Sequence, residues 1–447
     1  MRGRGCLFRA WGAILWRDGN IRLGDARLAG LTISEKILAR AAGRTAVRPG
    51  EEIAIRPDFV LAYELRGYSD VIFREMKALG VARLAEPERF AIFIDHRVPA
   101  KTPRDEELHV ETRRWCAEQG VPLFERRGIG HQVASEAGYA VPGGLVVHFD
   151  GHISQLGAFG TFAIGLRSAI LEAFVRDRVT LTVPATVLLH LAGSLPPGVM
   201  ARDIFHALVA RFGPTACLDK VLEIDGPAVD ALAMDGLQTI TGLAMFLGAV
   251  TAIVPPRGAR LAYAVERRRI ALPVACSDPD ANYAATLDLD LSTLEPILVA
   301  PPNASVTMPI SECIGLPIQA AYLGSCVSGR IEDLRVAARI LAGRSVAPGF
   351  SLNVVPTSQE IMAQAAREGL LTTLIEAGAF ISSPSCDFCG GHIGTMAAGQ
   401  RAVSTGTLNV PGRMGDVKSE IYLCNPAVLS ATAIEGRIAD PRPYLAS

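Results

Sequence analysis

The chain has 447 residues, of which 49% are hydrophobic and 20% are charged, and its formal net charge is −1. Such a length predicts two or three domains, and the near-zero net charge argues against a polyanionic partner such as nucleic acid. Nine cysteines, an odd number without the density of a disulfide scaffold, favour a reducing compartment, and we expect a cytoplasmic protein. No apolar run reaches the roughly 20 residues of a membrane span.

The first 30 residues differ from the rest of the chain. They carry several arginines, as a transit peptide does, but Asp18 and Asp25 are unusual in such a peptide. We therefore expect residues 1–30 to be a poorly ordered extension or the product of an upstream start codon. The folded part should begin at Leu31.

From residue 31 onward, helical and extended patterns alternate. Residues 32–42 predict a capped amphipathic helix, and residues 90–94 predict a buried strand. Further helices are predicted at residues 71–79, 105–118 and 161–175, and further strands at residues 53–55, 145–147 and 179–183. Alternating strands and helices favour layered α/β domains with parallel sheets.

Turns rich in proline and glycine divide this pattern at residues 193–198, 255–258 and 301–303. We predict α/β domains over residues 31–190, 191–300 and 301–447. In the third, residues 331–341 predict a helix with one apolar face. That helix begins shortly after Cys326, so its N-terminal dipole would favour a negative group near this cysteine.

Three cysteines of the third segment carry the most specific chemical signal. Cys326 follows a short apolar run, whereas Cys386 and Cys389 form a C-x-x-C pair that two glycines follow. Such a pair fits a redox dithiol, half of a zinc site or part of an iron–sulfur site. No second pair with zinc spacing is visible, and the glycines argue for a loop rather than for a thioredoxin-like helix. From spacing alone, three unrelated cysteines are an equally good interpretation.

The segments around these cysteines resemble the aconitase superfamily, and within it most closely the large subunits of 3-isopropylmalate dehydratase and homoaconitase. Residues 322–334 resemble the first cluster-cysteine motif of that family, and residues 384–389 resemble the second. The resemblance runs from about residue 31 to the end of the chain. It implies three α/β/α domains around a [4Fe–4S] cluster on Cys326, Cys386 and Cys389, with one iron left open to substrate.

Three further motifs resemble the active-site histidine motifs of the family. They supply the candidate catalytic residues Asp95, His96, His131, Asp150 and His152. Taken alone, these residues are better explained as loop ion pairs and structural histidines. A carboxylate on one ring nitrogen fixes the tautomer of a histidine and raises its pKa. We expect Asp95 to act in this way on His96, and Asp150 on His131, whereas Phe246 replaces the carboxylate that the family places near His152.

The substrate motifs match only in part. Arg413 matches one of the family's two carboxylate-binding arginines, whereas Leu408 replaces the other and Gly151 replaces a serine. Asn409 and Ser325 lie in the same motifs and are further candidates for substrate binding. Because an arginine–carboxylate pair is strong and often bidentate, losing one predicts a different substrate and a more apolar pocket.

The resemblance implies a hydro-lyase whose open iron acts as a Lewis acid on a hydroxy di- or tricarboxylic acid. In the family, the base lies on a small swivelling domain, and no such domain follows in this chain. A separate small subunit is therefore the expected partner in a heterodimer. The alternative is a non-catalytic cluster-binding or regulatory paralogue, because decay would also remove substrate residues. Retention of the cysteine and histidine motifs favours the enzyme.

Overall fold

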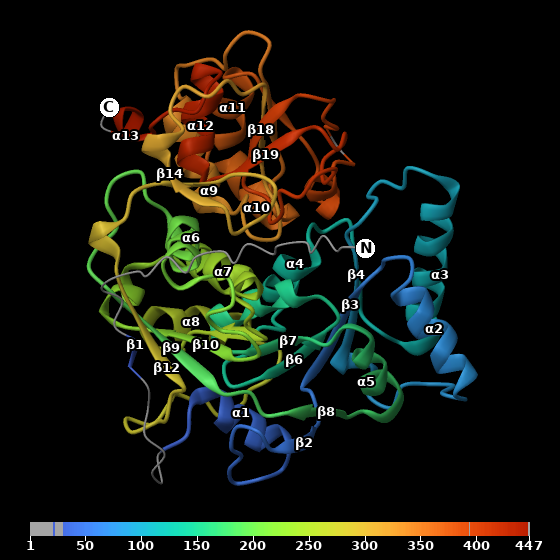
Figure 1. The fold of residues 1–447 in the computed structure, drawn as a ribbon. Coiled ribbons are helices and arrows are strands. Elements are labelled where there is room, and N and C mark those ends of the chain that lie inside the picture. Colours follow the sequence, from blue (N-terminus) through green and yellow to red (C-terminus); the bar gives the residue numbers. More distant parts are fainter. Residues whose placement is uncertain (1–20, 23–29, 393, 446–447) are drawn as a thin grey trace, which may run out of the picture.

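The computed structural model describes residues 21–22, 30–392 and 394–445, so most of the expected extension over residues 1–30 lies outside the described residues. Within it, β1 (Ile21–Arg22) pairs antiparallel with β12 (Ala285–Asp290). Two five-stranded sheets and a two-stranded sheet occupy one lobe of the molecule, and a seven-stranded sheet with its helices forms the lobe drawn above them (Figure 1).

The first sheet has five parallel strands in the order β5-β4-β3-β6-β7. These are β3 (Phe59–Tyr63), β4 (Phe90–Ile94), β5 (Leu123–Glu125), β6 (Leu145–His148) and β7 (Phe162–Gly165). Every residue of β3, β4 and β6 is buried, which explains their unbroken apolar runs. The helices of this part are α1 (Ile33–Ala41), α2 (Ser69–Ala78), α3 (Pro103–Gln119), α4 (Gly130–Glu136) and α5 (Ile170–Arg176), with the 3-10 helices η1 (Pro87–Arg89), η2 (Gly151–Phe159) and η3 (Arg167–Ala169).

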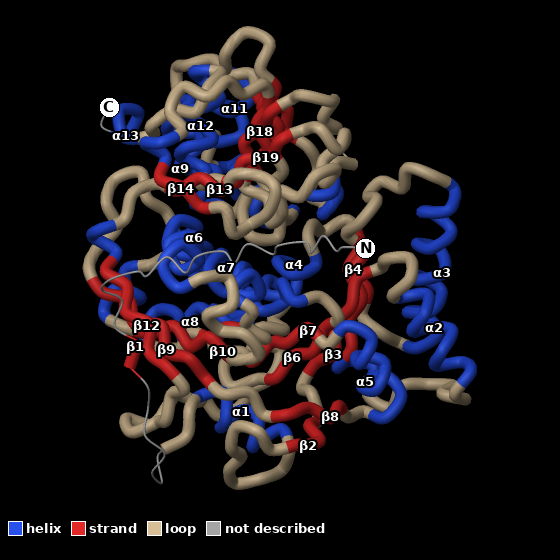
Figure 2. Tube along the Cα trace, in the orientation of Figure 1, coloured by secondary structure: helices blue, strands red, loops and turns tan. Residues whose placement is uncertain are grey.

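The second sheet has the order β1-β12-β9-β10-β11, and all its pairings except that of β1 are parallel. Its remaining strands are β9 (Thr186–Ala192), β10 (Val221–Asp225) and β11 (Thr251–Ile253). The accompanying helices are α6 (Ala201–Phe212), α7 (Met234–Leu243), α8 (Gly258–Arg267), η4 (Pro227–Ala231), η5 (Ala244–Leu247) and η6 (Leu291–Thr293). Figure 2 shows the strands of the first two sheets crossing the lower lobe, apart from those of the third.

The third sheet has seven strands in the order β14-β13-β19-β18-β15-β16-β17. The five from β19 to β17 run parallel, and β13 pairs antiparallel with both of its neighbours. These strands are β13 (Ile297–Val299), β14 (Thr307–Pro309), β15 (Ala320–Leu323), β16 (Ser351–Val354), β17 (Ala379–Ile381), β18 (Arg401–Ser404) and β19 (Glu420–Leu423). The helices are α9 (Ile331–Leu341), α10 (Gln359–Arg367), α11 (Leu370–Glu376), α12 (Pro426–Glu435), α13 (Arg442–Leu445), η7 (Ile310–Glu312) and η8 (Cys386–Gly390).

One hydrophobic core runs through the first two sheets, and a separate core lies under the third. The domain boundary expected at residue 190 is not marked by a break in this core, and it stays a prediction. Cys326 and Val327, which follow β15 of the third sheet, belong to the first core. This loop consequently fastens the upper lobe to the lower one at the place where the candidate cysteines begin.

Most predicted elements are confirmed, among them the helix at 331–341, the strand at 90–94 and a capping box at Thr32 that starts α1. The helix predicted over residues 161–175 is wrong in its first half, where β7 precedes α5. A fully buried parallel strand has no alternating pattern, so its apolar run cannot be told from a helix by periodicity. The strand near residue 180 is present as β8 (Val179–Thr182), but it pairs antiparallel with β2 (Glu52–Ile55) in a separate sheet.

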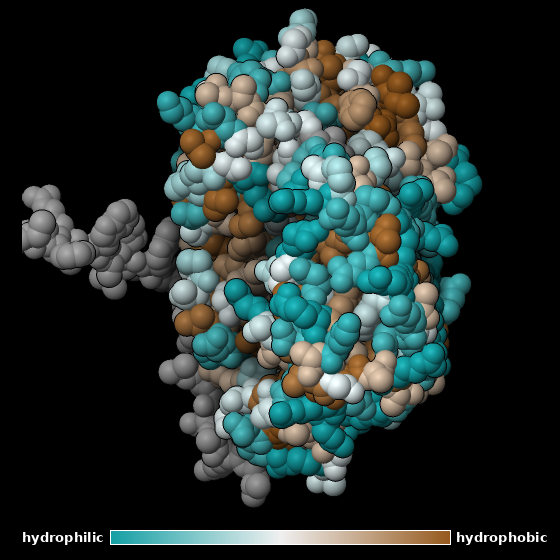
Figure 3. All heavy atoms as spheres, turned by 90° about the vertical axis from the view of Figure 1, so that its right-hand side faces the viewer, coloured by the Kyte–Doolittle hydropathy of each residue, from teal (hydrophilic) through white to brown (hydrophobic). Residues whose placement is uncertain are grey.

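The face of the molecule that carries α2 and α3 is mostly hydrophilic, with apolar residues singly or in small groups (Figure 3). Among the described residues, no helix combines the length and the apolar character that crossing a membrane requires.

Candidate active site

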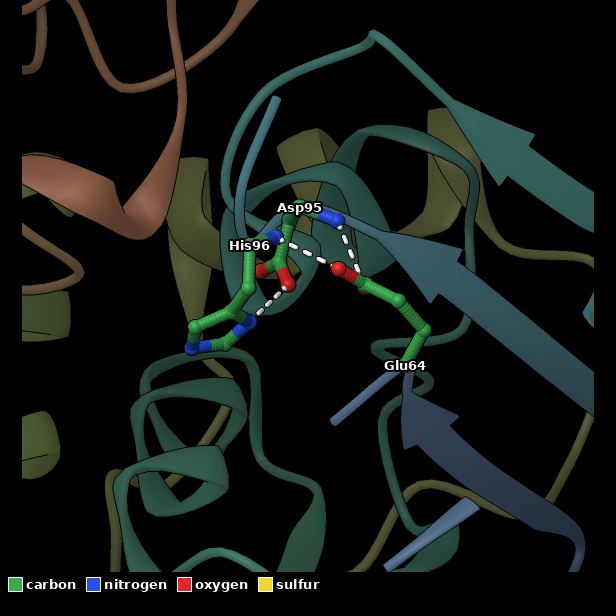
Figure 4. A group of neighbouring side chains, drawn as sticks. All are labelled: Glu64, Asp95 and His96. Carbon is green, nitrogen blue, oxygen red and sulfur yellow. Dashed lines mark hydrogen bonds and ion pairs between the residues drawn. The ribbon is translucent and has the colours of Figure 1, made fainter. Parts of the chain in front are cut away.

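Two acidic side chains lie beside a histidine at the carboxyl ends of β3 and β4 (Figure 4). Asp95 Oδ1 is 2.7 Å from His96 Nδ1, and the Glu64 carboxylate accepts the backbone N–H groups of Asp95 and His96, both at 2.9 Å. Because an ionised carboxylate only accepts hydrogen bonds, His96 Nδ1 must carry a proton. The other ring nitrogen points away from both carboxylates and is left for another partner.

Electrostatics favour a charged His96. Burial lowers the pKa of His96, but the adjacent Asp95, helped by Glu64 and Asp387, raises it by more and brings that pKa to about 9. Burial, followed by repulsion from Asp95, raises the pKa of Glu64 well above its ordinary value. The His96–Asp95 pair is therefore an ion pair at neutral pH, held in place by Glu64 behind it.

Glu64, Asp95 and His96 also offer ligand atoms within 4.8 Å of one another. Both Glu64 oxygens already accept backbone N–H groups, and the second Asp95 oxygen accepts the N–H of Gly130 at 2.6 Å. All four carboxylate oxygens are thus committed to hydrogen bonds. The group supports His96 and the start of α4 rather than offering free ligands to a cation.

The second histidine–carboxylate pair differs from the expected one. Asp150 Oδ1 accepts the backbone N–H of His152 at 2.8 Å and lies 3.0 Å from His152 Nδ1, while Oδ2 accepts the Tyr63 hydroxyl at 3.1 Å. No hydrogen bond joins Asp150 to the described atoms of His131, its expected partner, whose Nε2 is buried without a partner. The reason is local, because Asp150 caps the N-terminus of η2 and so turns its carboxylate toward His152.

Tyr63 lies among three histidine rings. Its ring centroid is 4.7 Å from that of His96, 5.0 Å from that of His148 and 6.0 Å from that of His131. Burial lowers the pKa of His131 and, more strongly, that of His148, so both are neutral. Burial also opposes charge on His152, but Asp150 raises its pKa above the ordinary value. The carboxylate-paired histidines and the neutral ones therefore have different proton-transfer properties.

The three candidate cysteines come from two segments, a loop and a short 3-10 helix. Cys326 follows β15, whereas Cys386 and Cys389 lie in η8, and all three are free thiols. The Cys386 backbone N–H donates to the Asp95 carbonyl at 2.8 Å. The cysteine loop therefore lies directly against the loop that carries His96.

The thiols disfavour ionisation unless a positive group is near. Burial, followed by Cys386 and Cys389, raises the pKa of Cys326 well above its usual range, and burial with Asp95 does the same for Cys386. Burial also acts on Cys389, but Arg413 and Thr407 outweigh it and lower that pKa to about 7. A bound metal cluster would remove this penalty by neutralising the thiolates.

The spacing of the thiols distinguishes between metal groups. Three thiolates on one zinc ion would lie about 3.8 Å apart, given tetrahedral angles and a Zn–S distance near 2.3 Å. Among the described residues, these three sulfurs do not form a group with all members within 4.8 Å of one another. Free thiols set wider than one ion requires fit an iron–sulfur cluster better.

Arg330 ties the cysteine loop to the histidine segments. Its guanidinium is fully buried and donates to Gln132 Oε1 at 2.9 Å, to Gln155 Oε1 at 2.6 Å and to the Cys326 carbonyl at 2.7 Å. Gln132 neighbours His131 in α4, and Gln155 lies in η2 beyond His152. One side chain thus sets Cys326 relative to both helices.

The candidate substrate residues lie in different settings. Arg413 Nη2 is 3.2 Å from Cys389 Sγ, and its Nε is buried without a partner among the described residues. Asn409 donates to the Ala300 carbonyl at 2.9 Å, while its Oδ1 is buried and has no partner within the described structure. The Ser325 hydroxyl donates to the Thr405 carbonyl at 3.0 Å and is thereby engaged within the protein. Of these three side chains, that of Arg413 hydrogen-bonds to a candidate cysteine sulfur.

Two of the substituted positions lie beside His152. The Phe246 ring stands edge-on to the His152 ring, with the centroids 5.9 Å apart. A Cβ atom on Gly151 would lie 3.4 Å from Met245 Sδ. Residues of η5 therefore place apolar groups where the family pattern has a carboxylate and a hydroxyl.

Sequence reasoning missed Glu64, Tyr63 and His148. All three stand at the carboxyl ends of strands, Tyr63 and Glu64 at β3 and His148 at β6. Since parallel α/β sheets place ligands at this edge, the strand ends themselves were the available signal.

A sequence model of the aconitase family (aconitate hydratase) matches residues 35–317 and 312–436. The 3-isopropylmalate dehydratase large subunit 1 of Methanopyrus kandleri is 37% identical over 420 residues, covering 93% of this chain and 100% of that protein. The corresponding large subunit of Moorella thermoacetica is 39% identical over 417 residues, covering 92% and 99%. Among solved structures, holo-form aconitase X of Thermococcus kodakaraensis matches with a TM-score of 0.47 and 12% identity, covering 79% of this chain and 84% of that chain.

Proposed function

The chain belongs to the aconitase family, and on that premise we propose that it is the large subunit of a hydro-lyase. The proposed reaction adds or removes water on a hydroxy di- or tricarboxylic acid. The relatives named above are large subunits of 3-isopropylmalate dehydratase. We therefore expect the substrate to be an acid of the malate type.

The observation that carries the proposal is the hydrogen bond from the Cys386 N–H to the Asp95 carbonyl. It brings three free thiols against a histidine whose protonation is controlled by a carboxylate. A hydro-lyase needs both parts in one place, namely a group that binds the leaving oxygen and a group that exchanges its proton.

Cys326, Cys386 and Cys389 would hold a [4Fe–4S] cluster, which supplies Lewis-acid chemistry toward substrate oxygens when bound. The remaining work falls to side chains. His96 is the proposed partner of the substrate hydroxyl, because Asp95 holds its Nδ1 proton and leaves Nε2 free to exchange one. Arg413 is the proposed ligand of a substrate carboxylate, since its Nε has no partner in the described part of the chain and charged hydrogen bonds of this type are strong.

His131 and His152 are the proposed contacts for the water that is lost or gained. The Nε2 atom of each is buried and without a partner in the described structure. Such an orphaned nitrogen in a closed site invites a small polar molecule. The neutral His131 can accept a proton from water, whereas His152 can accept one at Nε2 and return it, because Asp150 stabilises the charged ring.

We propose a separate small subunit as the partner, supplying the base that removes the substrate α-proton and further arginines. The support is the word "large subunit" in the names of the relatives, together with the family resemblance. Purified alone, the chain should turn over none of these acids.

The test is to co-express the chain anaerobically with the small subunit from the same genome, and to assay 3-isopropylmalate, citrate, homocitrate and methyl-substituted malates. His96→Gln should lower kcat roughly 10²- to 10⁴-fold, as expected for loss of an acid–base group. The matched control is His190→Gln, because His190 also pairs with a carboxylate, Asp288, but is 42% exposed on β9. It should retain full activity.

A cluster-loaded complex that acts on none of these acids would instead support the non-catalytic paralogue. Robust turnover by the chain without a small subunit would refute the hypothesis that activity requires a second subunit.

A further inference from the structure

We infer that Tyr63 is a positioning residue, whose hydroxyl holds Asp150 and, through Asp150, orients His152 toward the reacting molecule. This inference rests on the proposed function of the same site. It assigns a role to a side chain that no motif of the sequence singled out.

Tyr63 and His152 bind different oxygens of one carboxylate, that of Asp150. Tyr63 donates its hydroxyl to Asp150 Oδ2 at 3.1 Å, while Asp150 Oδ1 serves the backbone N–H and Nδ1 of His152 at 2.8 and 3.0 Å. With each oxygen bonded to a different residue, the carboxylate cannot rotate without breaking one of these bonds. Removing the hydroxyl would leave Asp150 held from one side alone.

The carboxylate in turn decides the tautomer of His152. A carboxylate accepts but does not donate, so the ring proton of neutral His152 must reside on Nδ1 and leave a lone pair on Nε2. That Nε2 is buried without a partner among the described residues, and it is the atom to which the proposed function gives the water. Orientation of Asp150 therefore fixes which nitrogen faces the chemistry.

Packing around the Tyr63 ring fixes the direction of its hydroxyl. Tyr63 is the last residue of β3 and is 7% exposed. The Phe149 ring stands edge-on to it at a centroid distance of 4.5 Å, and the His96 ring packs on it at 4.7 Å. The phenol thus contacts one histidine–carboxylate pair through its ring and the other through its oxygen. A rotation of this ring would disturb both pairs.

The competing interpretation is that Tyr63 is only a packing residue. In that case the ring matters and the oxygen does not. Tyr63→Phe separates the two cases, because it deletes the oxygen and keeps the ring. The chain offers a matched control in Tyr139, whose hydroxyl is buried with no partner among the residues that the structure describes. Its ring packs on Phe59 in the core of the same sheet, with the centroids 5.0 Å apart.

The kinetic test compares Tyr63→Phe and Tyr139→Phe in the co-expressed complex, on whichever acid of the panel the wild type turns over. Tyr63→Phe should lower kcat at least about tenfold with little change in KM, as for loss of an outer hydrogen bond that orients a histidine. Tyr139→Phe should match the wild type in kcat and KM. Equal kcat for the two variants would overturn the inference.

The second test does not depend on turnover. With ¹⁵N-labelled histidine in the cluster-loaded complex, ring-nitrogen NMR reports the tautomer of each of the eight histidines, and His152→Gln assigns the signal. At a pH where the ring is neutral, His152 should be an Nδ1–H tautomer in the wild type and in Tyr139→Phe, and a mixture of tautomers in Tyr63→Phe. An unchanged His152 signal in Tyr63→Phe overturns the inference even if kcat falls. An inactive wild-type complex would refute the proposed function, and the NMR result would still decide the role of Tyr63.

Discussion

Asp387, which lies between the paired cysteines, accepts the backbone N–H of Arg97 at 2.8 Å, and its second oxygen accepts that of the next residue, Val98, at 3.0 Å. Asp387 itself is 1% exposed. The residue inside the C-x-x-C motif therefore clasps the loop that directly follows His96, although 290 positions separate the two along the chain. The cysteine loop and the histidine loop form one unit.

We expect Asp387→Ala to loosen this unit. Each N–H left without a partner costs roughly 1–3 kcal/mol, so the cysteine loop should open more often and expose bound iron. The measurement is the rate of iron loss to a chelator under anaerobic conditions, which should rise. Asp416→Ala is the control, because Asp416 also accepts a backbone N–H, that of Lys418 at 2.8 Å, in an exposed turn. Equal rates of iron loss in the two variants would show that the hydrogen bonds of Asp387 do not hold the cysteine loop closed.

Cluster binding should depend on Cys326, Cys386 and Cys389 alone. A serine at any of them should abolish the broad absorbance at roughly 400 nm that thiolate–iron transitions produce, and should lower the iron content per chain. Cys276→Ser is the control, since Cys276 is a half-buried free thiol elsewhere in the chain. Full absorbance in Cys389→Ser would show that Cys389 is not a ligand.

The pH dependence of stability should report Glu223. Burial raises the pKa of this carboxyl to about 7 from the ordinary 4.5, while Ser277 and Tyr283 donate hydrogen bonds to it. The folded state keeps the proton that the unfolded chain releases above pH 4.5. The stabilisation is therefore complete below pH 4.5 and is lost as the pH rises to about 7, on the order of 3 kcal/mol in all.

Glu223→Gln cannot titrate, so the free energy of unfolding of this variant relative to the wild type should change across that pH interval. Denaturant unfolding at a series of pH values measures the difference, and effects common to both proteins cancel. Glu107→Gln, at an exposed position of α3, should follow the wild-type curve. A difference between Glu223→Gln and wild type that is constant from pH 4.5 to 7 would contradict the prediction.

Substrate preference should differ from that of ordinary isopropylmalate dehydratases. One charged hydrogen bond contributes about 1.5–3 kcal/mol, so Leu408 in place of an arginine should lower kcat/KM for isopropylmalate and citrate roughly ten- to a hundredfold. Leu408→Arg alone should not restore this activity, because Phe246 and Gly151 remain changed beside His152 and coupled sites do not add. Efficient turnover of isopropylmalate by the unmodified complex would show that these substitutions do not alter substrate preference.

Interactions between residues close in sequence determine much of the secondary structure, and the sequence therefore predicts it. The capped helix at Thr32, the buried strand at 90–94 and the amphipathic helix at 331–341 depend on capping and on periodicity within a few residues, and all three are present. The Asp95–His96 pair belongs to the same class, since adjacent residues at a strand end can meet without help from the rest of the fold.

Tertiary structure decided which distant groups meet. Sequence motifs suggested Asp150 for His131. The local cap of η2 directs one Asp150 oxygen to His152 instead, and the tertiary fold brings the Tyr63 hydroxyl to the other oxygen. Glu64 reaches the His96 loop because β3 and β4 are parallel neighbours in register, and Asp387 reaches it because the upper lobe packs onto the lower one. Hydrogen bonds between distant residues depend on the relative placement of strands and lobes, which is set by burial over the whole core and leaves no local trace in the order of residues.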